Sequence, residues 1–110
     1  MSCFVLDASA LFHGRDLRLF QGARLLTTRY VLEEIRDARA QAALEILNVE
    51  VVDIDEKELA AYSKAGLSRA DASLLALAHK TGCVLLTDDV GLAKAARRLG
   101  VKARGFYFVK

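Results

Sequence analysis

The sequence predicts a three-layer α/β/α domain with a central parallel sheet. Five short apolar runs alternate with segments of helical periodicity, and several of these runs are apolar at consecutive positions. Such runs are typical of strands that are buried on both faces of a parallel sheet. A chain of 110 residues with 54% hydrophobic residues can bury one sizeable core, so we expect residues 1–110 to form a single domain.

The order of the elements follows from the two periodicities. We expect strands at residues 3–6, 25–26, 49–54, 83–86 and from 101 onward, and helices that begin near residues 30, 42, 56, 69 and 90. A short helix is expected over Glu56–Lys64. Ser68 stands directly before the longest helical pattern, with Asp71 three residues later, as in a capping box. Gly82 and Gly100 are suited to left-handed caps at the ends of the last two helices.

Composition excludes several classes of protein. The high apolar content excludes disorder, and the longest uninterrupted apolar run has five residues, which is too short for a membrane span. The first residues lack the basic region of a secretory signal, so we expect a cytoplasmic protein with no membrane partner. Cys3 and Cys83 lie in apolar runs and are expected to be buried thiols rather than a disulfide or a metal pair. Two cysteines and two histidines exclude a zinc ribbon or finger.

Acidic residues follow the expected strands in a regular way. Asp7 ends the first apolar run, and Asp88 and Asp89 come directly after the fourth. Glu34 lies in the first two turns of the helix after the second strand, and Asp71 lies in the first turn of the long helix. Because ligands of open parallel sheets bind outside the carboxyl ends of the strands, four segments deliver an acid to one edge.

Each acid also has a structural interpretation. Asp7 or Ser9 could cap a helix that begins near Ala8, and Asp71 could complete a capping box. First-turn glutamates favour the helix dipole, and the paired aspartates could form a turn and a cap. These interpretations do not explain why the acids converge, since clustered carboxylates repel one another unless a cation neutralises them. Oxygen-only ligands with few histidines indicate Mg²⁺ or Mn²⁺.

Four segments resemble the motifs of the PIN-domain ribonucleases, in the order in which that family carries them. The segments are residues 4–11, 27–35, 67–78 and 85–89. The acids at the matching positions are Asp7, Glu34, Asp71 and Asp89. The resemblance spans residues 3 to about 103, which is nearly the whole chain.

This resemblance implies a Mg²⁺- or Mn²⁺-dependent endoribonuclease that cleaves single-stranded RNA and leaves a 5′-phosphate and a 3′-hydroxyl. Its metal ligands would be the four acids named above, with Asp88 assisting them. Ser9 and Thr87 would orient the carboxylates or a water molecule by hydrogen bonding.

Two branches of the family fit the motifs. Residues 33–37 and 87–89 look more like the Nin-one-binding type, which matures the 3′ end of small-subunit ribosomal RNA, although that type usually carries a zinc ribbon for which this chain has no ligands. The alternative is the toxin half of a toxin–antitoxin pair, which usually forms a homodimer and binds an antitoxin. We favour RNA processing, with pre-ribosomal RNA as the partner.

Basic residues follow the last of these acids. Beyond Asp89 the chain contains lysines and arginines but no further acid. The predicted contacts to the RNA backbone are Arg69, Lys94, Arg97 and Arg98, and the aromatic residues 106–108 could stack on bases. A solvated helix face is the alternative for any single cation.

Two other classes of protein remain to be weighed. A haloacid-dehalogenase-like phosphatase would need a second aspartate where Ser9 stands. A receiver-like, structural or non-catalytic metal- or RNA-binding module would not need Asp71 and Asp89 beside Asp7.

Overall fold

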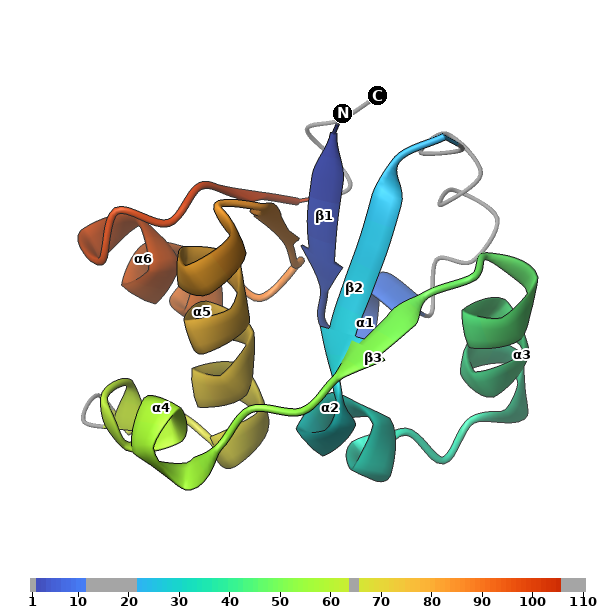
Figure 1. Ribbon diagram of the computed structural model, residues 1–110, viewed down its shortest axis with the longest axis horizontal. Coiled ribbons are helices and arrows are strands. Elements are labelled where there is room, and N and C mark those ends of the chain that lie inside the picture. Colours follow the sequence, from blue (N-terminus) through green and yellow to red (C-terminus); the bar gives the residue numbers. More distant parts are fainter. Residues whose placement is uncertain (1, 12–21, 64–65, 106–110) are drawn as a thin grey trace.

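The predicted architecture is present in the computed structural model, which describes residues 2–11, 22–63 and 66–105 (Figure 1). Five strands form one sheet in the order β3-β2-β1-β4-β5, and every neighbouring pair is parallel. The strands are β1 (Cys3–Leu6), β2 (Arg24–Thr28), β3 (Glu50–Val52), β4 (Val84–Leu86) and β5 (Ala103–Arg104).

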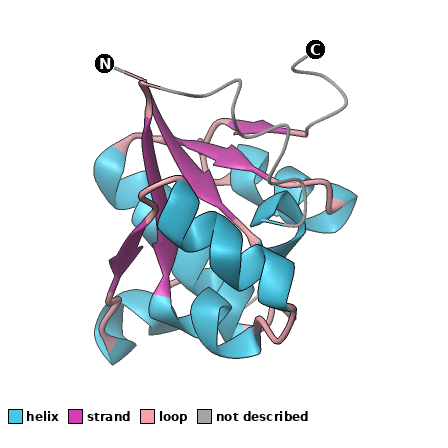
Figure 2. Ribbon diagram, turned by 90° about the vertical axis from the view of Figure 1, so that its right-hand side faces the viewer, coloured by secondary structure: helices cyan, strands magenta, loops and turns pink. Residues whose placement is uncertain are grey.

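Helices cover both faces of this sheet. They are α1 (Ala8–Leu11), α2 (Arg29–Glu34), α3 (Ala38–Ile46), α4 (Glu56–Ala60), α5 (Arg69–Thr81) and α6 (Val90–Arg98). In Figure 1, α4, α5 and α6 lie to the left of the strands, α1 and α3 lie to the right, and α2 lies below the ends of β1 and β2. Figure 2, turned by 90°, shows helices in front of the strands. Within the described ranges, no helix is long and apolar enough to cross a membrane.

The core confirms that the central strands are buried on both faces. Val5 and Leu6 of β1 and Leu85 and Leu86 of β4 are consecutive residues, and none of them exposes any surface. Helix α5 packs against β1, β2 and β4, and its residues 72–78 are all buried. Because consecutive side chains of a strand point to opposite faces, this pattern requires a covering layer on each side.

Helix ends follow the predicted capping chemistry. The Ser68 side chain accepts a hydrogen bond from the Asp71 amide at the start of α5, and Gly82 ends that helix with φ of 74°. Gly100, just beyond α6, has φ of 78°. Glycine suits both positions because it has no Cβ to clash in the left-handed region. The predicted helix over 56–64 is shorter, since α4 ends at Ala60 and residue 64 lies outside the described residues.

The prediction of two free thiols is wrong. Cys3 and Cys83 form a disulfide, with their Cα atoms 5.0 Å apart. The register of β1 on β4 pairs Phe4 with Val84, so Cys3 at the beginning of β1 stands opposite Cys83, which directly precedes β4. Neighbouring strands bring Cα atoms into the range that a disulfide spans. The 80 residues that separate the cysteines conceal this pairing in the sequence.

The topology singles out one place on the edge formed by the carboxyl ends of the strands. From β1 the chain proceeds outward to β2 and β3, and then returns to the other side of β1 to form β4 and β5. The order of strands therefore switches between β1 and β4, and open α/β sheets bind ligands at such a switch point. Asp7 follows β1, and Thr87 follows β4, at this position.

Candidate active site

Asp7 is a buried carboxylate at the switch point. Only 6% of its surface is exposed. Its Oδ1 accepts hydrogen bonds from Ser9 Oγ at 2.7 Å and from the Ala10 amide at 2.8 Å, and its Oδ2 accepts one from the Thr87 hydroxyl. Burial raises the pKa of Asp7 above its usual 3.8, the bonds from Thr87, Ser9 and Ala10 oppose that rise, and the charge of Asp88 adds to it.

Asp7 therefore combines a structural role with a buried negative charge. Its bond to the Ala10 amide shows that it caps α1, as the structural interpretation expected. Yet within the described part of the chain it forms no ion pair, so hydroxyls orient the carboxylate without neutralising its charge.

Asp71 connects the other acids to this region. It lies half-buried in the first turn of α5. Burial raises its pKa, a hydrogen bond with Ser68 opposes this rise, and the negative charges of three further acids raise the pKa again. Those acids are Asp89, Asp7 and Glu34. The other three predicted metal ligands thus each act on Asp71, although the four come from four segments of the chain.

The segment after β4 is held by hydrogen bonds on both sides. The Thr87 amide donates to the Arg104 carbonyl at 2.9 Å, and the Asp89 amide donates to Thr87 Oγ1 at 3.0 Å. The Asp88 amide donates to Ser9 Oγ at 3.3 Å. Asp89 Oδ1 accepts from the amide of Leu92 at 3.1 Å, so Asp89 caps α6. Ser9 and Thr87 therefore bind both Asp7 and the Asp88–Asp89 segment, as expected of residues that orient the acids.

The acids suit a divalent cation in their chemistry, although the described residues do not enclose one. Across residues 2–11, 22–63 and 66–105, no group of three acidic, histidine or cysteine side chains stands closed around one point. The predicted donor set nevertheless consists of carboxylate oxygens alone, and the charges of the other three acids add to the rise that burial causes in the pKa of Asp71. A hard cation such as Mg²⁺ or Mn²⁺ prefers oxygen ligands and would relieve that repulsion.

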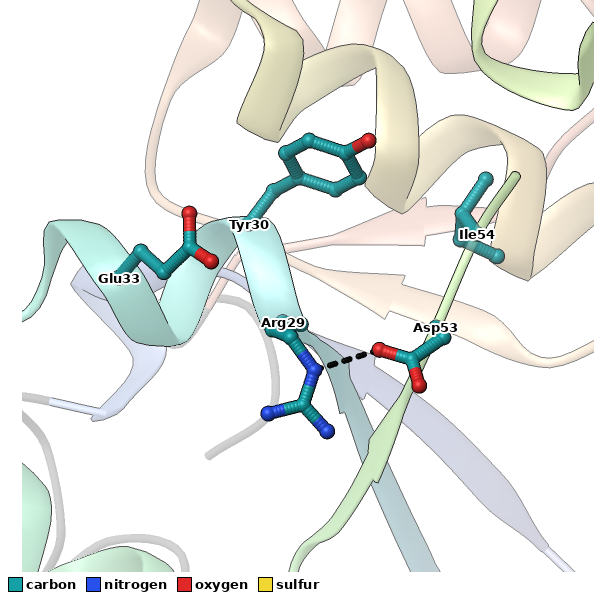
Figure 3. A pocket seen from close by; sticks show the side chains of 5 residues that line it. All are labelled: Arg29, Tyr30, Glu33, Asp53 and Ile54. Carbon is teal, nitrogen blue, oxygen red and sulfur yellow. Dashed lines mark hydrogen bonds and ion pairs between the residues drawn. The ribbon is translucent and has the colours of Figure 1, made fainter. Parts of the chain in front are cut away.

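Helix α2 presents its two glutamates to different surroundings. Glu33 lines a shallow hollow of about 160 Å³ together with Arg29, Tyr30, Asp53 and Ile54 (Figure 3). There Arg29 Nε donates to Asp53 Oδ1 at 2.6 Å, so an ion pair occupies one wall. Glu34 does not line the hollow, and its charge acts on Asp71 instead. The structure thus separates the predicted ligand from its neighbour.

Residues 4–109 match the family described as PIN domain. The chain belongs to the PIN-domain family.

Two curated relatives and one solved structure are similar to this PIN domain. It is 32% identical over 116 residues to Endoribonuclease Nob1 of Methanocaldococcus jannaschii, which covers 98% of this chain and 58% of that protein. It is 32% identical over 112 residues to Endoribonuclease Nob1 of Pyrococcus abyssi, which covers 91% of this chain and 66% of that protein. The chain thus spans less than two thirds of both relatives.

The solved structure has the same fold. A PilT N-terminus domain protein from Sulfolobus solfataricus P2 superposes with a TM-score of 0.75 at 18% identity, covering 96% of this chain and 88% of that one.

The predicted RNA contacts of this PIN domain fall into two groups. Arg69 Nη2 pairs with Glu56 at 2.5 Å, and the Arg69 guanidinium lies over the Tyr30 ring, 5.4 Å from its centroid. The other three, Lys94, Arg97 and Arg98, are exposed on α6. Arg97 also lines an open hollow of about 400 Å³ with Lys102 and Arg104. The aromatic residues 106–108 lie outside the described residues.

Sequence reasoning missed three buried hydroxyl groups in this PIN domain. Thr27, Thr28 and Ser73 expose none of their surface, and each forms a hydrogen bond to another segment. The available signal was their setting, because the threonines end an apolar strand and the serine interrupts the apolar face of α5. A polar side chain in such a place must find a partner when it is buried.

Proposed function

We propose that this PIN domain is a Mg²⁺- or Mn²⁺-dependent endoribonuclease that hydrolyses phosphodiester bonds of single-stranded RNA. The observation that carries the proposal is the buried carboxylate of Asp7 at the switch point, which forms no ion pair among the described residues, with the charges of further acids acting on the same region. A buried carboxylate beside further acids opposes folding unless a cation is bound, so the capping of α1 by Asp7 does not by itself explain this arrangement. The endoribonuclease names of the two curated relatives support the same activity.

The residues would divide the work as follows. Asp7, Glu34, Asp71 and Asp89 would hold the ion, with Asp88 assisting beside Asp7. A bound divalent ion supplies a water molecule of lowered pKa and stabilises the leaving oxygen. Thr87 and Ser9 donate to opposite oxygens of Asp7 and so fix the plane of its carboxylate. That fixed orientation reduces the freedom lost when a ligand binds.

The phosphate backbone of RNA would contact cations that form no ion pair with any acid in the described ranges. Lys94, Arg97 and Arg98 lie on α6, which begins directly after Asp89. Arg104 is paired with Leu86 in the sheet, one residue before Thr87, so it brings a cation beside the acidic edge. Several weak contacts of this kind suit a backbone that carries one charge per nucleotide.

Processing of pre-ribosomal RNA is the cellular role that we favour. The supporting observation is the similarity to Endoribonuclease Nob1 from two archaea along more than nine tenths of this chain. A toxin-type ribonuclease with the same chemistry would cleave unrelated cellular RNA equally well. Comparison of a precursor that extends beyond the 3′ end of small-subunit ribosomal RNA with an unrelated RNA of equal length distinguishes the two roles.

The decisive test is cleavage of single-stranded RNA by the purified protein with Mg²⁺, with Mn²⁺ and with excess chelator. We expect cleavage with either ion, complete loss in chelator, and recovery when Mn²⁺ is restored. The products should carry a 5′-phosphate and a 3′-hydroxyl. Cleavage that persists unchanged in chelator contradicts metal dependence, and Mn²⁺ binding without cleavage of any RNA would indicate a binding module.

A further inference from the structure

The end of β2 forms hydrogen bonds to two other acid-bearing segments through consecutive threonines. Thr27 Oγ1 donates to the carbonyl of Leu6 at 2.8 Å, and Leu6 directly precedes Asp7. Thr28 Oγ1 lies 2.7 Å from Ser73 Oγ of α5, two residues beyond Asp71. Consecutive residues of a strand point to opposite faces, so the two hydroxyls reach different partners. Both threonines are fully buried.

The direction of the Thr28–Ser73 hydrogen bond follows from the neighbouring contacts. Ser73 Oγ donates its only proton to the carbonyl of Ala70 at 2.6 Å. In the contact between the hydroxyls Thr28 must therefore be the donor. Thr28 Oγ1 in turn accepts from the Val31 amide at 3.3 Å, which makes Thr28 the N-cap of α2. One continuous chain of hydrogen bonds thus runs from the first turn of α2 to the first turn of α5.

This chain joins the parts of the molecule that carry the acids. Val31 lies one turn before Glu34 in α2, and Ala70 directly precedes Asp71 in α5. Thr27 adds the end of β1, where Asp7 follows. Hydrogen bonds between buried groups have a defined length and direction, so this chain of bonds constrains how the three segments lie relative to one another.

We propose that Thr27, Thr28 and Ser73 are positioning residues, which fix β1, α2 and α5 relative to one another and thereby set the spacing of Asp7, Glu34 and Asp71. This inference rests on the proposed metal-dependent function. The three hydroxyls are fully buried and would act through the segments that they join. Partners that only orient a ligand typically change metal affinity by about 10–100-fold when they are removed.

The test compares Mn²⁺ binding, by calorimetry on the full chain, with thermal unfolding in chelator. In Thr28→Val and in Ser73→Ala we expect about 10–100-fold weaker Mn²⁺ binding and a lower melting temperature. Thr28→Ser keeps the hydroxyl and should restore both properties. Thr81→Val is the matched control, because Thr81 donates to the Leu77 carbonyl at the far end of α5, away from the acids. It should bind Mn²⁺ as the wild type does.

The double variant Thr28→Val/Ser73→Ala separates positioning from stability. It removes both hydroxyls, so its melting temperature should exceed that of Ser73→Ala, in which the buried Thr28 hydroxyl has lost its acceptor. Its Mn²⁺ binding should stay as weak as in either single variant, because the connection is still missing. Affinity that recovers together with stability would overturn the positioning role, and so would normal Mn²⁺ binding in both single variants. A wild-type protein that binds no Mn²⁺ would overturn the proposed function itself, and the positioning role with it.

Discussion

The acids of this protein fall into two regions with opposite surroundings. On the outer surface, four acids each face a cation, in the pairs Arg24–Glu50, Arg29–Asp53, Arg69–Glu56 and Lys80–Glu58. The side chain of Asp53 is 73% exposed in its pair, whereas Asp7 at the switch point exposes 6% of its surface. At the switch point the acids face hydroxyl groups and other acids. Within the described ranges, the four predicted ligands form no ion pair.

This difference distinguishes a structural acid from a functional one. An exposed ion pair is already neutralised and screened by water, so it contributes little to stability and leaves nothing for a ligand to complete. A buried carboxylate without a counter-charge is unfavourable until a cation binds. The comparison therefore predicts that substitutions at the switch point reduce activity, whereas substitutions in the surface pairs change activity and stability little.

The largest effect is expected for Asp7→Asn. This variant should lose cleavage by more than the roughly 10–100-fold typical of partners that only orient a ligand. In chelator it should unfold at an equal or higher temperature than the wild type, because a buried charge has been removed. Asparagine can still accept from Ser9 and the Ala10 amide. RNA cleavage and melting curves with and without Mg²⁺ provide the measurement.

Glu50→Gln is the matched control for Asp7→Asn, because it also removes one acidic charge, but from the pair with Arg24 on the outer surface. It should cleave RNA as the wild type does. If Asp7→Asn melts clearly lower in chelator and still cleaves RNA, then Asp7 is only the cap of α1, and the distinction between the two regions fails.

The next largest effect distinguishes two neighbouring acids at the switch point. Asp89→Asn should reduce cleavage and Mg²⁺ affinity more than Asp88→Asn, because the charge of Asp89 acts on Asp71 and the family motif places the ligand there. The charge of Asp88 acts on Asp7, and loss of this assisting residue in Asp88→Asn should reduce cleavage by about 10–100-fold. A side-by-side Mg²⁺ titration checks the order. Asp88→Asn inactive with Asp89→Asn near normal would reverse the two roles.

The dependence of stability on pH should also differ between the regions. Burial raises the pKa of Asp7 and Asp71 above 3.8, so folding disfavours their ionised forms. Without metal, the contribution of these two carboxyl groups to the free energy of unfolding therefore falls as the pH rises from 3.8 through their raised pKa values. It stays low at higher pH. Asp7→Asn should lose less stability over that window than the wild type and should match its trend below pH 3.8.

The stabilisation that a bound cation provides should depend on pH in the opposite direction. Metal competes with protons for the carboxylates, so the rise in melting temperature caused by Mg²⁺ should grow with pH over the same window. Chemical unfolding at several pH values, in chelator and in Mg²⁺, measures both trends. Equal pH trends for the wild type and Asp7→Asn in chelator would show that Asp7 does not titrate in this way.

The smallest effects are expected from single cations on α6. Alanine at Lys94, Arg97 or Arg98 should weaken binding of every RNA sequence to a similar degree. Each lost phosphate contact should reduce the salt dependence of log K by about 0.7, the value for single strands. Lys80→Ala is the control, because Lys80 pairs with Glu58. If all four variants bind RNA alike, the α6 cations are a solvated helix face.

Much of this protein could be predicted from local patterns in the sequence. The strands, the long helix with its Ser68 cap, and the glycine at 82 depend on hydrophobic periodicity and on capping chemistry, which act over a few residues. The edge on which the acids gather could also be inferred, because the carboxyl ends of parallel strands share one edge whatever their order. The four motif positions then named Asp7, Glu34, Asp71 and Asp89.

Only the tertiary structure decided which distant residues meet. The order β3-β2-β1-β4-β5 places β4 beside β1, and this neighbourhood creates the Cys3–Cys83 disulfide that sequence reasoning rejected. It also brings the Thr87 hydroxyl to Asp7, 80 residues away, and α5 against β2 brings Ser73 to Thr28. Such contacts depend on strand order and register, which are set by the packing of the whole core. No local pattern of residues contains that information, so a buried hydroxyl in a sequence shows that a partner is needed but not which one it will be.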